Sequence, residues 1–139
     1  ESLHDAGFDD LDVLKVEGNW SAASGEVRLH ALIAKSPDID AIFVGNDQMA
    51  LGVLQAARRL GLQVPGDIGI VGFDDIPESA YFFPSLSTVR QNAERLGALA
   101  VEQMAKIIQA QQNNEEFKPD THWVQPRLIV RKSSNRDSG

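Results

Sequence analysis

Four side chains in this sequence have the chemistry to hold one small polar ligand. They are Trp20, Asn46, Asp74 and Gln91, and each follows closely on a short run that is predicted to be a strand. Asparagine and glutamine offer donors and an acceptor, an ionised aspartate accepts through two oxygens, and an indole offers a flat apolar face. The set suits a small polyhydroxylated molecule, whose hydroxyls would bond to the polar groups while a ring face stacks on the tryptophan.

Each of the four residues also has a simpler interpretation. Trp20 could belong to the core, and Asn46 could serve only as the cap of the helix that starts after it. Asp74 could form a turn, and Gln91 could be an exposed strand residue. Because all four fall at strand ends, a shared ligand site is favoured over four unrelated structural roles.

A cluster of carboxylates is another interpretation of the same region. Asp47, Asp74 and Asp75 could hold a magnesium ion or support acid–base catalysis. However, adjacent residues on an extended segment point in opposite directions, so only one of Asp74 and Asp75 can face a given pocket. Binding is therefore favoured over catalysis at this site.

Other common catalytic and metal-binding patterns do not occur in the sequence. It has neither a phosphate-binding GxxxxGK loop nor a GxSxG nucleophile elbow, and no GxGxxG turn lies between a strand and a helix. His4, His30 and His122 are far apart in sequence, and there is no cysteine. We therefore expect no enzymatic activity, no catalytic residues, no metal site and no bound cofactor.

The elements that must position the four side chains are clearest between residues 40 and 75. Apolar runs at 41–44 and 68–73 predict two buried strands, and between them residues 48–60 place apolar side chains three and four positions apart. A strand–helix–strand unit of this length implies two parallel strands with a right-handed crossover. In such sheets ligands bind beyond the carboxyl ends of the strands, where Asn46 and Asp74 fall.

The rest of the chain extends this α/β pattern. The predicted order is β-α-β-α-β-loop-β-α-β. Residues 2–6 resemble the end of a helix, residues 76–83 form a loop with a short helical turn, and residues 133–139 are small, polar and expected to be disordered. The other predicted elements are strands at 13–17, 86–89 and 128–130 and helices at 22–35 and 93–112.

Composition limits the partners of the chain. With 139 residues it can form one globular domain with a core, and its formal net charge of −7 does not favour direct binding to nucleic acid. No apolar run approaches the roughly 20 residues that a membrane span needs, so no membrane association is expected. The absence of cysteine is compatible with a cytoplasmic protein.

Three ordered motifs resemble the LacI/GalR family of bacterial transcription regulators. They are VGNDQMALG at 44–52, VPGDIGIVGFDD at 64–75 and PSLSTVRQ at 84–91, and the resemblance extends from Gly7 to Lys132. It implies a periplasmic-binding-protein-like (type I) α/β domain with a parallel sheet and two lobes. Residues 1–91 and 120–134 would form most of the C-terminal lobe, residues 92–119 would belong to the N-terminal lobe, and residues 135–139 would be a disordered tail.

The resemblance also implies a function. The chain would be the effector-binding and dimerisation region of a repressor, with a carbohydrate effector held by Trp20, Asn46, Asp74 and Gln91. Operator DNA would be bound only by a helix-turn-helix that this chain lacks. A homodimer would form through helices 21–35 and 47–60 and loop 77–84, whose three consecutive aromatics (81–83) also suggest a partner surface because they cannot all be buried.

Two other functions are compatible with the same residues. A periplasmic sugar-binding receptor of a transport system would share the fold and the cleft. An α/β enzyme that uses Asp47, Asp74 or Asp75 is the third possibility, and it predicts loss of turnover in Asp74→Asn where the binding hypothesis predicts only loss of affinity.

Overall fold

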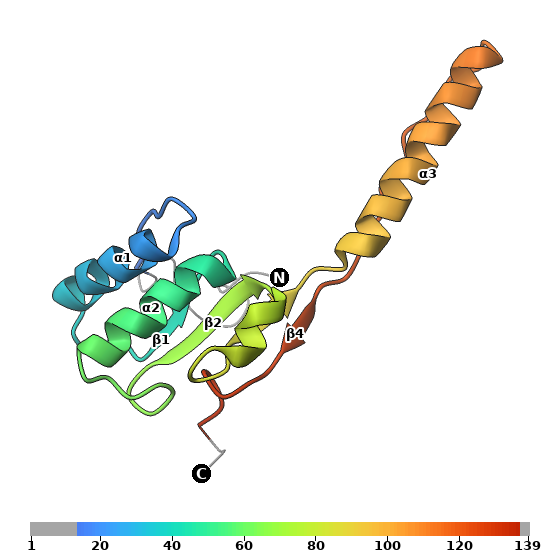
Figure 1. Ribbon diagram of the computed structural model, residues 1–139. Helices are drawn as coiled ribbons and strands as arrows, with labels where there is room; N and C mark the ends of the chain where they lie inside the picture. The colour runs from blue at the N-terminus through green and yellow to red at the C-terminus, as the bar shows by residue number, and fades with distance from the viewer. Residues whose placement is uncertain (1–13, 137–139) are drawn as a thin grey trace.

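The computed structural model describes residues 14–136, and residues 1–13 and 137–139 lie outside the described range (Figure 1). The fold is a mixed α/β domain with a mostly parallel sheet, as predicted. In chain order its elements are α1 (Ala22–Lys35), β1 (Ala41–Phe43), α2 (Asp47–Arg59), β2 (Gly69–Asp74), the 3₁₀ helix η2 (Pro77–Tyr81), β3 (Ser87–Arg90), α3 (Ala93–Gln112) and β4 (Arg127–Ile129).

The four strands form one sheet in the order β1-β2-β3-β4. β1 pairs with β2 and β2 with β3 in parallel, whereas β4 runs antiparallel to β3. This confirms the parallel pairing predicted for residues 41–75. The carboxyl ends of the three parallel strands therefore lie along one edge of the sheet.

Helices α1 and α2 start where the sequence predicts and pack directly on each other. Ser21 caps α1 by accepting a hydrogen bond from the Ser24 amide at 3.2 Å. A Cβ atom on Gly25 would overlap the Met49 carbonyl group, and one on Gly52 would overlap the Ala22 carbonyl group. The two glycines thus allow the two backbones to approach closely.

The core lies between these helices and the sheet. Helix α2 packs against β2, and α1 packs against α2 (Figure 1). The largest buried apolar side chains come from α1, from β2 and the residue before it, and from the residue before β3. They are Leu29, Ile68, Ile70 and Leu86. The opposite face of the sheet is more open, since Phe43 on β1 is 63% exposed and contacts the Phe73 ring edge to face.

Helix α3 extends away from the rest of the domain, together with the segment that returns to β4 (Figure 1). None of its residues is buried. Its exposed apolar side chains are Leu96, Val101, Met104 and Ile108. A 20-residue helix with an apolar stripe and no buried residue lacks the packing that ordinarily stabilises helices.

The predicted strand at 13–17 is wrong for residues 14–17, which lie in no strand. Val16 does pack against the core, so the alternation correctly marked an inward-facing side chain. Strand formation also needs a neighbour with free backbone groups, and alternation carries no information about that neighbour. Val13 and the predicted helix end at 2–6 lie outside the described residues. The other predicted strands and helices agree with the structure within one residue at each end.

The prediction of a disordered tail from residue 133 onward is wrong for residues 133–136. Ser133 is fully buried, and its hydroxyl donates to the Ile70 carbonyl at 2.6 Å. The Arg136 guanidinium donates to the Asp40 carbonyl at 2.8 Å. Polar residues stay ordered here because they bond to backbone carbonyls near the amino ends of β1 and β2. Composition does not reveal such bonds. Residues 137–139 lie outside the described range.

Candidate functional site

The strand register brings three of the four predicted residues to one edge of the sheet. Asn46 comes just after β1, Asp74 ends β2, and Gln91 follows β3. In the ladders Phe43 pairs with Val71, and Asp74 pairs with Arg90. The carboxyl ends of β1, β2 and β3 are therefore level with one another.

Asn46 joins Trp20 to this edge. Its Nδ2 donates to the Trp20 carbonyl oxygen at 3.1 Å, while its Oδ1 accepts from the Met49 amide at 2.9 Å and caps α2. The Trp20 side chain is 68% exposed and lies over Gly45, so it is not a core residue. Asn46 is a helix cap, and in the same position it fixes the loop that presents the indole.

Asp74 and Gln91 form a second pair at the same edge. Gln91 Nε2 donates to Asp74 Oδ1 at 3.0 Å, and both side chains are exposed. The bond leaves the second carboxylate oxygen of Asp74 and the amide oxygen of Gln91 as acceptors toward solvent. The backbone of Asp74 has φ 112°, a conformation that side chains rarely adopt and that is common at functional sites.

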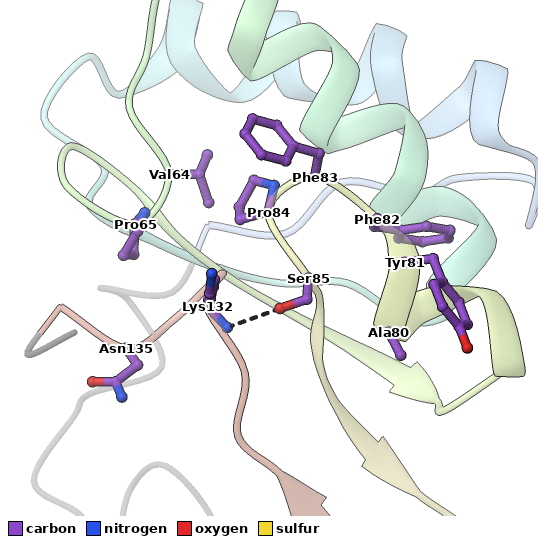
Figure 2. A pocket seen from close by; sticks show the side chains of 10 residues that line it. All are labelled: Val64, Pro65, Ala80, Tyr81, Phe82, Phe83, Pro84, Ser85, Lys132 and Asn135. Atoms are coloured by element: carbon purple, nitrogen blue, oxygen red, sulfur yellow. Dashed lines mark hydrogen bonds between the residues drawn. The ribbon is translucent and has the colours of Figure 1, made fainter. Parts of the chain in front are cut away.

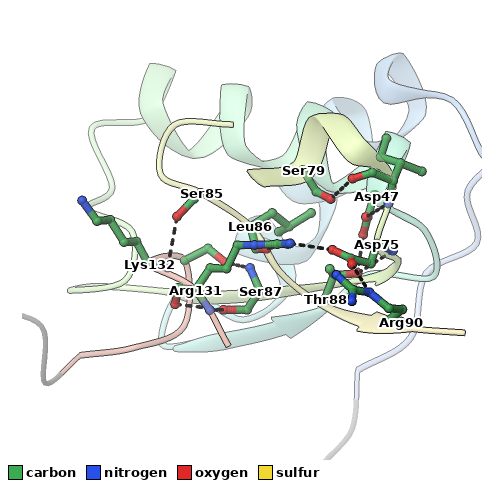
Figure 3. A network of polar contacts seen from close by, with 12 residues as sticks. Asp47, Asp75, Ser79, Ser85, Leu86, Ser87, Thr88, Arg90, Arg131 and Lys132 are labelled. Carbon is green, nitrogen blue, oxygen red and sulfur yellow. Dashed lines mark hydrogen bonds and ion pairs between the residues drawn. The ribbon is translucent and has the colours of Figure 1, made fainter. Parts of the chain in front are cut away.

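A buried carboxylate connects the strand ends beneath these pairs. Asp47, which follows Asn46, is fully buried; its Oδ1 accepts from the Thr88 hydroxyl at 2.6 Å and its Oδ2 from the Ile76 amide at 3.0 Å (Figure 3). A Cβ atom on Gly72 would overlap this carboxylate, so the glycine leaves space for it. Asp47 thus ties the start of α2 to β3 and to the loop after β2.

Asp75 bonds to a cluster of arginines, whereas Asp74 bonds to Gln91, so the two carboxylates have separate partners. The backbone here is turned and not extended as predicted, since both residues have positive φ. The Asp75 carboxylate is 4% exposed and accepts from Arg90 Nε at 2.5 Å and from Arg131 Nη2 at 2.7 Å (Figure 3). Burial raises the pKa of Asp75, but hydrogen bonds from Arg131 and Arg90 and their positive charges outweigh burial and hold this pKa below its ordinary value.

Sequence reasoning missed this cluster. Arg131 lies 56 positions from Asp75, and no local pattern marks the two residues as partners. The three aspartates 47, 74 and 75 do not form a metal site either. Within residues 14–136 no group of three or more histidine, cysteine, aspartate or glutamate side chains could hold a metal ion.

Two cavities lie elsewhere on the domain. One of about 560 Å³ lies between Val64, Pro65, the 80–85 segment and Lys132 (Figure 2). The other, of about 660 Å³, lies against the open face of the sheet beside Phe43 and Leu128. None of the four predicted residues lines either cavity, and Trp20, Asp74 and Gln91 lie exposed on the surface.

The arrangement has the chemistry of a binding surface. Its exposed groups are the Trp20 indole face, the Asp74 carboxylate and the Gln91 amide. Asn46 is half-buried with both ends of its amide bonded to backbone groups, and the Asp47 and Asp75 carboxylates are occupied by hydrogen bonds from the protein. Such a surface can accept hydrogen bonds from a ligand, donate hydrogen bonds to it and stack on one of its faces.

None of the helices in the described part of the chain is long and apolar enough to cross a bilayer.

The chain matches the family model described as a periplasmic binding protein-like domain over residues 1–134. It is 34% identical over 133 residues to the HTH-type transcriptional repressor PurR of Edwardsiella ictaluri (strain 93-146). That alignment covers 96% of this chain but 38% of the relative, so the chain spans less than half the length of the curated relatives that it matches.

Solved structures of transcription regulators are similar to the fold. The lac repressor dimer bound to operator and the anti-inducer ONPF has a TM-score of 0.76 and 33% identity, over 85% of this chain and 40% of the repressor. The complex of the transcriptional regulator CelR with cellobiose has a TM-score of 0.80 and 30% identity, over 95% of this chain and 39% of CelR. The relatives named here are transcriptional repressors or regulators.

Proposed function

Because this chain belongs to the LacI/GalR family of transcriptional regulators, we propose that it is the effector-binding and dimerisation region of a bacterial repressor. Its domain is periplasmic binding protein-like. The ligand would lie against Trp20, Asn46, Asp74 and Gln91. The main support for this proposal is that these residues form two hydrogen-bonded pairs, Trp20 with Asn46 and Asp74 with Gln91. Both pairs lie at the carboxyl ends of the parallel strands.

The chemistry of the edge favours a carbohydrate. A sugar has hydroxyls that could donate to the free oxygen of Asp74 and an apolar ring face that could stack on the Trp20 indole. The likeness to a regulator solved with cellobiose supports this class of effector. Nucleobases also combine a flat face with polar edges, so they belong in the same ligand screen.

We place α3 and the returning segment (92–119) in a second lobe that would face this edge and close the cleft. This is supported by the absence of any buried residue in α3. Amide hydrogen exchange tests it: α3 should exchange more slowly in the complete protein than in the 139-residue chain. Equal exchange rates would remove α3 from an interlobe contact.

The homodimer would form through residues 21–35, 47–60 and 77–84. In this surface the Tyr81 and Phe83 side chains are 88% and 87% exposed, whereas Phe82 packs against the core. The 560 Å³ cavity lies beside these aromatics and offers an apolar recess to a partner (Figure 2). The lac repressor, whose fold is similar, was solved as a dimer.

Regulation would work by a shift between two lobe arrangements. Effector bound at the edge would favour one arrangement and thereby change the affinity of DNA-binding heads outside this chain for the operator. The protein would act in the cytoplasm. The test is fluorescence anisotropy of the complete protein on DNA from its own promoter, with sugars and nucleobases added singly. An effector should change operator affinity roughly 5- to 150-fold. A set of compounds that bind without changing DNA affinity would contradict the switch.

A further inference from the structure

The buried Asp75 carboxylate belongs to the residue that directly follows the exposed Asp74. We propose that Asp75 is a positioning residue, which holds Asp74 and Gln91 in the geometry that contacts the effector without touching the effector itself. The part of the inference that concerns the effector rests on the proposed function. The part that concerns the positions of Asp74 and Gln91 depends only on residues of this chain. The inference is carried by the backbone conformation at 74–75 and by the hydrogen bonds of the Asp75 side chain.

The backbone at these two residues needs an external support. Asp74 has φ 112° and Asp75 has φ 55°, so two successive residues with side chains occupy the left-handed region. Such conformations persist where surrounding contacts over-determine them. Asp74 itself is exposed and its one bond from Gln91 comes from another exposed side chain, so Asp74 is poorly placed to supply that support.

Asp75 supplies the support from three directions. Arg131 donates to its Oδ1 at 2.7 Å, Arg90 donates to its Oδ2 at 2.5 Å, and its own amide donates to the Thr88 hydroxyl at 3.3 Å. The Asp75 carboxylate is 4% exposed and Arg131 is mostly buried, so the charge-assisted bond between them is largely shielded from water, whereas Arg90 is half exposed. The two arginine contacts fix the direction of the Asp75 side chain, and the amide contact holds the backbone turn that Asp75 shares with Asp74.

The arginines are themselves anchored to the sheet. Arg131 Nη1 donates to the Leu86 carbonyl at 2.7 Å, and the Arg131 amide donates to the Ser87 hydroxyl at 2.7 Å (Figure 3). Arg90 pairs with Asp74 in the β2–β3 ladder and directly precedes Gln91. The same contacts therefore fix both members of the Asp74–Gln91 pair.

The position of the two arginines adds a link to lobe movement. Arg90 ends β3, just before the chain leaves for α3, and Arg131 follows β4, where the chain has returned. Asp75 fastens the outgoing and returning strands together at the point where Asp74 meets the ligand. A ligand that shifts Asp74 would therefore also shift Asp75, and through the Asp75 carboxylate it would displace both Arg90 and Arg131.

Crystal structures and binding measurements on the complete protein test this role. In Asp75→Asn, Asp74 should leave the left-handed region, and its carboxylate should separate from Gln91. The affinity for cellobiose, measured by calorimetry, should fall about tenfold. Arg131→Lys keeps a positive charge but loses the two-pronged donor, so it should produce a smaller shift in the same direction and serves if Asp75→Asn does not fold.

Double-mutant cycles separate positioning from general destabilisation. Asp75→Asn and Gln91→Ala should be non-additive in cellobiose affinity because both act on Asp74, whereas Asp75→Asn and Asn46→Ala should be additive. An Asp75→Asn structure with Asp74 unmoved and the Gln91 contact intact would overturn the inference. So would additive effects in both cycles. If the parent protein does not bind cellobiose, that result counts against this effector, and the crystal structures still decide the role of Asp75.

Discussion

The side-chain amide of Gln91 donates to the carboxylate of Asp74 at 3.0 Å, although the residues are 17 positions apart. The contact exists because β2 and β3 are parallel neighbours that end level with each other, with Asp74 opposite Arg90. It presents one carboxylate oxygen and one amide oxygen together at the sheet edge. Because the two groups are already fixed, they can bond to neighbouring hydroxyls of a ligand with little further loss of side-chain conformational entropy.

Replacing Trp20 by alanine should reduce sugar affinity roughly tenfold because the stacking face is lost. Asn46 bonds to the Trp20 backbone carbonyl, so the loop keeps its anchor in this variant. Trp123 is 89% exposed and provides the matched control, since Trp123→Ala should leave affinity unchanged. Titration calorimetry with the sugar found in the screen measures both. Equal affinities of Trp20→Ala and the parent would remove the indole from the site.

Acid should weaken the fold through Asp75. Its pKa is lower in the folded protein than the ordinary value of 3.8, so the unfolded chain binds this proton first as pH falls. The stabilisation is fully present above the ordinary value and is lost as pH falls below it toward the folded pKa. Urea unfolding between pH 7 and pH 3 should therefore show a steeper loss for the parent than for Asp75→Asn. Parallel pH profiles would contradict this contribution.

The packing of α1 on α2 should not tolerate a side chain at Gly52. Gly52→Ala places a methyl group against the Ala22 carbonyl and should destabilise the fold by about 1–3 kcal/mol. Gly97 in α3 has no neighbour within 4 Å of an added Cβ, so Gly97→Ala should stabilise its helix by about 0.5–1 kcal/mol. Urea unfolding at pH 7 measures both variants. A neutral Gly52→Ala would show that the helices can move apart at little cost.

A charge on the loop aromatics should weaken the homodimer. Phe83→Asp places a carboxylate in the proposed interface, where it would be desolvated without a partner, and the dimer should dissociate at least tenfold more readily. Gln112→Asp at the far end of α3 is the control and should leave dimerisation unchanged (Figure 1). Sedimentation equilibrium of the complete protein measures both. Unchanged dimerisation in Phe83→Asp would move the interface away from loop 77–84.

The sequence by itself determined the elements and the edge at which polar side chains gather. Helix periodicity, the caps at Ser21 and Asn46 and the short apolar runs are local signals, and local backbone preference is enough to express them. The parallel pairing of β1 and β2 followed from the helix between them. From these facts the placement of Asn46 and Asp74 at strand ends could be predicted.

Only the tertiary structure decided which polar groups meet and which segments stay ordered. The Asp75–Arg131 ion pair, the Asp47–Thr88 bond and the burial of Ser133 join residues 41 to 63 positions apart. Such contacts depend on strand register and on the return path of the chain, which a pattern of neighbouring residues does not encode. For the same reason, alternation at 13–17 marked an inward-facing Val16 but could not supply the neighbouring strand that pairing requires.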